Sequence, residues 1–209
     1  MDRTKNRPIA SGKIQPSEAL SFGIITSILS IIILGLSVNW LAASLLAFTI
    51  FFYAVVYTMW LKRHTVQNIV IGGAAGAFPP IIGHVCATGS IGVEALILFL
   101  IIFLWTPPHF WALALVNKSD YRAANIPMLP IIYGDMATRK NIFIYSLLLM
   151  PCVYLPWILN YSGNFYVIVV TLLNIEFIRR AISVLKETTQ KDVESFTTLN
   201  FKNLFKINI

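Results

Sequence analysis

Long apolar stretches constrain this chain more than any other feature of its sequence. A helix that crosses a membrane needs about 20 mostly apolar residues. Six stretches meet this need: about 19–37, 40–61, 67–87, 93–116, 141–159 and 163–185. They do not alternate strictly between apolar and polar residues, which argues against a membrane β-barrel. The sequence therefore predicts an all-α fold, a polytopic bundle of six transmembrane helices.

The composition agrees with a membrane protein. Of the 209 residues, 57% are hydrophobic and 12% are charged, and the mean hydropathy is +0.73. A soluble domain carries about a quarter charged residues. Cys86 and Cys152 are too few and too far apart for a disulfide framework or a zinc knuckle. The polar, basic first 18 residues lack the apolar core of a cleaved leader.

The basic residues predict the topology. If the six spans alternate in direction, all 16 lysines and arginines fall on one side of the membrane. The positive-inside rule makes that side cytoplasmic. The net charge of +7 is thus a topology signal, and we expect no nucleic-acid partner. The predicted location is a cell membrane, with the basic loops in the cytoplasm.

Costly polar groups gather at the cytoplasmic end of the fourth span, in residues 105–130. Pro107 and Pro108 are expected to disrupt this span. If the helix resumes after them, His109 shares one face with Trp105, Ala112 and Leu113. A carboxylate, an aromatic ring and a cation follow three turns later, at Asp120, Tyr121 and Arg122. These groups predict a pocket for a ligand with a charged headgroup and an apolar tail.

Two more basic clusters belong to the same side. One is the N-terminal "DRTKNRPIASGKI", with Arg3, Lys5 and Arg7 at alternate positions, and the other is "WLKRHT", with Lys62 and Arg63. Each alone is an ordinary topology signal. If these two clusters and residues 105–130 surround the opening of one pocket, they would bind phosphate strongly. Lysine and arginine make charge-assisted hydrogen bonds to phosphate oxygens.

Two polar residues within spans allow simpler interpretations. His84 follows a helix break at Pro79–Pro80, and it lies either near the outer interface or in the wall of a cavity. Glu176 precedes Arg179 and Arg180 by three and four residues, so an ion pair within the helix explains it.

Four motifs taken together resemble a known family: "RTKNRP", "YTMWLKRHTVQNIVIGGAAGAFPPIIGH", "WTPPHFWALAL" and "DYRAANIPMLP". In this order they closely resemble the protohaem IX farnesyltransferases, or haem O synthases, among the UbiA-type membrane prenyltransferases. The resemblance covers roughly residues 1–185, which we interpret as a partial prenyltransferase membrane domain. Residues 186–209 are interpreted as a polar tail that lies on the membrane surface or is disordered.

The resemblance implies transfer of a farnesyl group from farnesyl diphosphate to a vinyl group of haem b, giving haem O, with Mg²⁺ assisting diphosphate departure. It implies Asp120 as the metal ligand and, with His109, as a catalytic residue. The diphosphate would be bound by Arg3, Lys5, Arg7, Lys62, Arg63 and Arg122. The prenyl and haem cavity would be lined by His84, Trp105, Phe110, Trp111 and Tyr121. Besides the two substrates and the lipid bilayer, the implied partner is a haem A synthase or an oxidase-assembly protein.

The sequence departs from the family pattern in three ways. The second acidic motif has Ala124 where a second aspartate is typical. The first acidic motif, of NxxxDxxxD type, is expected before "MDRTKNRP". Of the family's nine spans, two N-terminal ones and one C-terminal one are expected but not found. We therefore expect weak Mg²⁺-diphosphate binding and poor activity from this chain alone. The alternatives are an inactive remnant of such an enzyme and a prenyltransferase for a quinone precursor.

Overall fold

The computed structural model describes residues 6–186, and within this range every regular element is a helix. The predicted all-α bundle is confirmed. Arg3, Lys5 and the tail after Lys186 lie outside the described residues. The elements are α1 (Pro16–Ser37), α2 (Trp40–Phe51), η2 (Phe52–Trp60), η3 (Leu61–Arg63), α3 (Asn68–Ala77), α4 (Pro79–Thr88), α5 (Val93–Val116), α6 (Lys118–Ala123), α7 (Leu129–Ile132), α8 (Gly134–Cys152), α9 (Leu155–Ile158) and α10 (Asn164–Lys186).

Five helical stretches are long and apolar enough to cross a membrane: Pro16–Ser37, Trp40–Arg63, Asn68–Thr88, Val93–Val116 and Gly134–Ile158. They indicate an integral membrane protein. The sixth predicted span, 163–185, does form a helix, α10, but within 6–186 only the other five meet the criteria of a span. The reason is the cluster of Glu176, Arg179 and Arg180 in its second half. The prediction was correct about six long helical segments and overestimated the apolar character of the last.

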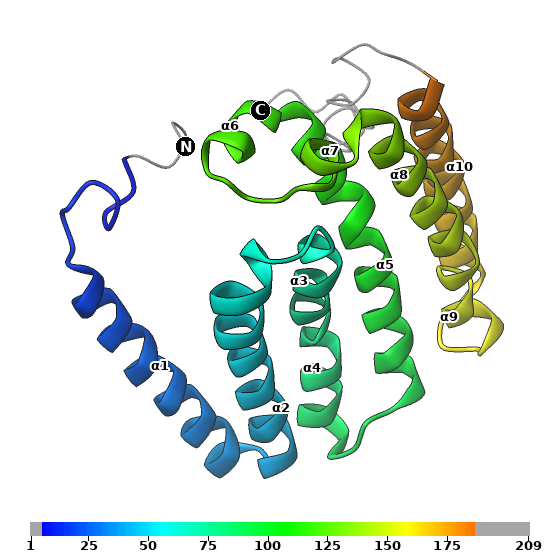
Figure 1. Cartoon of the computed structure of the whole chain (residues 1–209). Coiled ribbons are helices and arrows are strands. Elements are labelled where there is room, and N and C mark those ends of the chain that lie inside the picture. The colour runs from blue at the N-terminus through cyan, green and yellow to red at the C-terminus, as the bar shows by residue number, and fades with distance from the viewer. Residues whose placement is uncertain (1–5, 187–209) are drawn as a thin grey trace, which may run out of the picture.

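The helices follow one another in an arc, with each long segment antiparallel to the one before it (Figure 1). The main contacts join α1 to α2, α2 to α4, α3 to α5, α5 to α8, and α8 to α10. One end of the bundle carries η3, α6, α7 and the start of α8, and the opposite end carries the α1–α2 and α4–α5 links and α9 (Figure 1). All described lysines and arginines lie on segments of the first end, which we call the basic end. The described cations thus share one end of the bundle, and the remaining ones lie outside the described residues.

The two proline pairs act differently. Pro79 and Pro80 open α4 after a break at Phe78, as expected, because a helix needs no backbone donor in its first turn. In contrast, α5 continues through Pro107 and Pro108, so the predicted disruption there is wrong. Both rings are fully buried. Packing at the centre of the arc holds the helix together although two backbone hydrogen bonds are missing.

The second span widens into a π-helix, η2, before its turn at the basic end. In this segment the Thr58 hydroxyl donates to the Tyr53 carbonyl, five residues earlier, at 2.7 Å. π-helical turns are rare and occur frequently at functional sites. Here the wider turn brings the Tyr57 ring against Gly72 of α3, where a Cβ atom would lie 2.6 Å from two ring carbons.

The main hydrophobic core lies between α5, α8 and α10. Trp111, Ile142, Phe177 and their neighbours form one buried cluster, and a smaller cluster around Ala42 and Val85 joins α2, α4 and α5. Alanines at the contacts let the helices approach closely, which is the usual packing mode in membranes. This core fixes α5 and α8, the two helices that flank α6 and α7.

Candidate functional site

The buried side chain of Asn68 ties together two segments at the basic end. It is 1% exposed and opens α3. Its Nδ2 donates to the Lys62 carbonyl at 3.3 Å and to the Pro127 carbonyl at 3.2 Å. Lys62 belongs to η3, and Pro127 belongs to the connection between α6 and α7. The η3 cations and the α6–α7 segment are thereby held beside each other, although they are far apart in sequence.

Tyr57 of η2 packs close to the same end of the bundle. Its ring centroid lies 5.5 Å from that of Tyr53, and its ring lies against Gly72 of α3. Tyr57 therefore joins η2 to α3, the helix that Asn68 opens.

Asp120 is a half-buried carboxylate with no side-chain hydrogen bond or ion pair to any described residue. The nearby Asp135 differs, because it accepts from Lys118 at 2.6 Å. Of the two carboxylates on α6 and at the start of α8, Asp120 is therefore free to bind a cation and Asp135 is already neutralised. The acidic residue selected from sequence is the free one.

Three cations accompany Asp120 at this end. Lys62 is half-buried, Arg63 and Arg122 are exposed, and none of the three forms an ion pair with a described residue. Lys62 and Arg63 come from η3, and Arg122 comes from α6. A free carboxylate and unpaired cations at one end of the bundle suit an anionic ligand that carries its own metal ion, since each charge of the complex then has a partner.

The aromatic groups of α5 divide into two sets. Trp105 and His109 stack with ring centroids 4.6 Å apart, and Phe110 meets His109 edge-on at 5.3 Å. Trp105 and Phe110 are exposed and His109 is half-buried, so these three rings are accessible from the side of the helix. The predicted shared face of Trp105 and His109 is confirmed.

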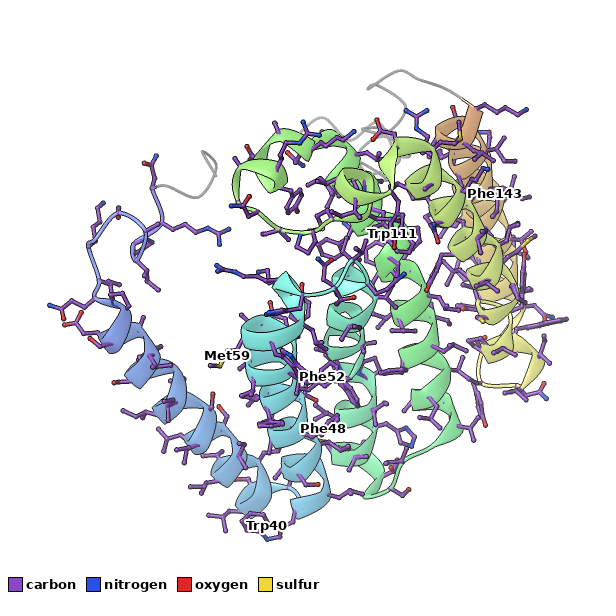
Figure 2. The ribbon with its side chains drawn as sticks, in the orientation of Figure 1. Trp40, Phe48, Phe52, Met59, Trp111 and Phe143 are labelled. Atoms are coloured by element: carbon purple, nitrogen blue, oxygen red, sulfur yellow. The ribbon has the colours of Figure 1, made fainter. Side chains whose placement is uncertain are left out.

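Trp111 lies in the core and not in a cavity wall, which corrects its predicted role. It is 1% exposed and meets Tyr145 of α8 edge-on, with centroids 5.1 Å apart. Figure 2 shows it at the upper part of α5, among the side chains that face α8. Adjacent residues of a helix point in different directions, so Phe110 and Trp111 cannot share one environment.

His84 lies at the opposite end of the bundle from Asp120. It belongs to α4, and its Nε2 lies 2.3 Å from the position that a Cβ atom would take at Gly92, in the α4–α5 link. The Glu94 carboxylate approaches the same position to 2.5 Å. The structure does not bring His84 together with His109 or Asp120, and it favours the interpretation that His84 lies near the outer interface.

Arg7 is in the turn that precedes α1. It lines an open, mostly apolar groove of about 790 Å³ with residues of the same turn and of the start of α1: Pro8, Ile9, Ala10, Ile14, Glu18, Ala19 and Phe22. The helix that follows this turn, α1, packs against α2. Within the described residues, no hydrogen bond or ion pair joins Arg7 to Asp120 or to η3.

Sequence reasoning missed two residues of this end, Tyr57 and Asn68. A signal for Asn68 existed, because an amide inside an apolar stretch is costly unless it is bonded. The placement of Tyr57 had no comparable signal, since it depends on the π-helix and on the space left by Gly72.

Comparison with known proteins agrees with this geometry. Residues 1–207 match the UbiA prenyltransferase family. The chain belongs to this family. No solved structure matches it significantly.

Among its relatives, "Protoheme IX farnesyltransferase 2" of Mesorhizobium japonicum is 60% identical over 185 residues, 88% of this chain and 59% of the relative. "Protoheme IX farnesyltransferase 1" of the same organism is 54% identical over 209 residues, 99% of this chain and 67% of the relative. "Protoheme IX farnesyltransferase" of Brucella ovis is 58% identical over 178 residues, 85% of this chain and 57% of the relative. The chain thus spans between 57% and 67% of the length of these UbiA-family relatives.

Within residues 6–186, no three His, Cys, Asp or Glu side chains gather in a way that could hold a metal ion. Mg²⁺ in phosphate-transfer sites is commonly held by one or two carboxylates together with substrate phosphates and water. Asp120 can supply one such carboxylate, because its side chain has no other described partner. The residues present therefore fit a Mg²⁺ ion that is held largely by a diphosphate substrate.

Proposed function

We propose that this chain transfers the farnesyl group of farnesyl diphosphate to a vinyl group of haem b, giving haem O. The observation that carries the proposal is that Asp120, Lys62, Arg63 and Arg122 lie on segments at one end of the bundle without ion pairs to described residues, in a chain whose relatives at 54–60% identity are named protoheme IX farnesyltransferases. The finer assignments below follow from this proposal.

Diphosphate binding uses the charges of the basic end. Asp120 would hold Mg²⁺, which when bound supplies positive charge to the departing diphosphate. Lys62, Arg63 and Arg122 take the remaining negative charge through charge-assisted hydrogen bonds. Arg3, Lys5 and Arg7 are proposed to add positive charge to the same site, and of these only Arg7 is among the described residues. Diphosphate leaves with the electron pair of the C1–O bond, and the farnesyl group becomes an allylic cation.

The cation then adds to the haem. The vinyl group attacks C1 of the farnesyl cation and forms a carbon–carbon bond. A water molecule captures the new cation and loses a proton, which leaves the hydroxyethylfarnesyl group of haem O. Trp105, Phe110 and Tyr121 offer aromatic faces that stabilise a passing carbocation. His109, whose ring nitrogens have no described hydrogen-bond partner, is available for the haem iron or for this proton.

The proposed setting is the inner membrane, with the basic end in the cytoplasm, where positive loops are retained. Residues 1–185 form the membrane domain in this proposal. A haem A synthase or an oxidase-assembly protein is the proposed recipient of the product.

The test is product formation in membranes that contain the full chain, farnesyl diphosphate, Mg²⁺ and either haem b or an aromatic acid of the quinone-precursor type. We expect a farnesylated, hydrated haem by mass spectrometry. We also expect turnover well below that of the Mesorhizobium relative assayed alongside, because one carboxylate holds Mg²⁺ weakly. Prenylation of the aromatic acid alone would support the quinone-precursor alternative. A membrane-inserted chain that modifies neither acceptor would contradict the proposal.

A further inference from the structure

Arg139 is a buried cation outside the proposed site. It lies in the second turn of α8 and is 9% exposed. Its Nε is buried without a hydrogen-bond partner, and no described residue forms an ion pair with its guanidinium. Arginine cannot shed its proton under ordinary conditions, so this side chain stays charged in the bundle.

The nearby carboxylates are bound elsewhere. Asp135 precedes Arg139 by four residues, a spacing that favours an ion pair on a helix. It pairs with Lys118 of α6 instead, at 2.6 Å. Glu176 of α10 accepts from Arg179 and Arg180 at 2.6 to 2.8 Å. The described chain thus supplies carboxylates to neighbouring cations and none to Arg139.

Two contacts fix the level of Arg139 in the bundle. The Trp111–Tyr145 ring contact and the Lys118–Asp135 ion pair set the antiparallel register of α5, α6 and α8. Arg139 lies between these two levels on α8, which packs against α5 and α7. The start of α8 belongs to the basic end of the bundle (Figure 1).

A buried guanidinium without a partner is strongly unfavourable, whereas one bound to an oxyanion is stable. The planar fork of arginine matches phosphate and carboxylate oxygens, often through two parallel hydrogen bonds. We propose that Arg139 anchors a binding site for the oxyanion of an amphiphile, a phosphate or a carboxylate. This chemistry has two sources here, the phosphate of an anionic phospholipid and a propionate of haem b. The haem source rests on the proposed function, and the lipid source does not.

The test measures thermal unfolding of the full chain in nanodiscs, so that its outcome is independent of prenyl transfer. Wild type is compared with Arg139→Gln and with Lys140→Gln, which removes an exposed cation from the next position of the same helix. The probes are phosphatidylglycerol against phosphatidylcholine, and haem b against its dimethyl ester, which lacks the propionate charges.

We expect one anionic probe to raise the melting temperature of wild type and Lys140→Gln by roughly 3 °C or more, and that of Arg139→Gln by much less. A shift with phosphatidylglycerol identifies the lipid phosphate, and a shift with haem b but not its ester identifies the carboxylate. Equal shifts in wild type and Arg139→Gln, or no shift with either probe, would overturn the proposal.

A second variant covers the case in which Arg139→Gln does not accumulate in membranes. Arg139→Lys keeps the charge but loses the planar fork, so the anion-dependent shift should fall by about half or more. A full shift in Arg139→Lys would show that only a positive charge is needed at this position, and it would contradict the proposed arginine–oxyanion contact.

Discussion

At the scale of single residues, the basic end is defined by charges without partners and by one tightly placed ring. Asp120, Lys62 and Arg122 make no ion pair with the described residues, whereas Asp135 and Lys118 neutralise each other. The proposed chemistry requires that Asp120, Lys62 and Arg122 are not paired with other side chains of the protein. The position of Tyr57 depends on the absence of a side chain at Gly72.

A methyl group at Gly72 should therefore disturb the site. Its carbon would lie 2.6 Å from the Tyr57 ring, so Gly72→Ala must displace the ring and should cost about 1–3 kcal/mol of stability. Prenyl transfer should fall with it. Gly76→Ala, on the same helix, meets nothing within 4 Å and should be neutral or stabilising by up to about 1 kcal/mol. Thermal unfolding and turnover of both variants check this, and equal behaviour of the two would refute the role of Gly72.

Residue-level prediction from sequence worked where the chemistry is local. A carboxylate and cations beside an apolar run are visible in the sequence, and Asp120, Lys62 and Arg122 do lie at one end. The environments of Trp111 and His84 were not visible. The environment of Trp111 depends on the packing of α5 against α8. The environment of His84 depends on which end of the kinked third span it occupies.

At the scale of elements, the polar links between helices decide whether the site holds together. Asn68 connects η3 to the α6–α7 segment through two carbonyls. Asn68→Ala should leave both carbonyls without this donor and should cost about 1–3 kcal/mol. It should also make the α6–α7 segment more sensitive to limited proteolysis. Asn141→Ala removes only a bond within α8 and should change stability by less than about 1 kcal/mol. Unchanged proteolysis of Asn68→Ala would contradict the link.

The ion-pair cluster of α10 offers a second test at this scale. As predicted from spacing, Glu176 binds Arg179 and Arg180, at 2.7 and 2.6 Å. Glu176→Gln should lower the melting temperature by roughly 3 °C or more, because Arg180 is largely buried. Asp135→Asn breaks a more exposed pair and should have a smaller effect. A larger loss in Asp135→Asn would contradict this ranking.

Helix ends were predictable where caps or breakers mark them, and helix continuity was not. The fourth span was predicted at 93–116, and α5 has these bounds. Its prolines were expected to interrupt it, but both are fully buried at the centre of the arc, where tertiary packing outweighs local preference. The π-helix of the second span has no sequence signature of its own. It packs against α3 through Tyr57 and Gly72.

At the scale of the whole molecule, the shared end of all described cations is the strongest agreement between sequence and structure. It follows from span count and alternation, which are global properties of the sequence. The side of the membrane can be tested with single cysteines in a chain whose Cys86 and Cys152 are replaced by alanine. In spheroplasts, a membrane-impermeant thiol reagent should label Ser90→Cys, in the α4–α5 link. Ser119→Cys, in α6, should be labelled only after permeabilisation. The reverse pattern would overturn the cytoplasmic assignment of the basic end.

The most direct test of the account is the dependence of haem farnesylation on Asp120. Asp120→Asn keeps the size of the side chain and removes the free carboxylate, whereas Asp135→Asn removes a carboxylate that is already paired. We predict that Asp120→Asn lowers Mg²⁺-dependent formation of farnesylated haem by about 100-fold or more, a loss of about 2.7 kcal/mol or more in transition-state stabilisation. Asp135→Asn should retain most of the activity. Equal activity of Asp120→Asn and wild type would contradict the central claim that this carboxylate and its neighbouring cations bind the diphosphate.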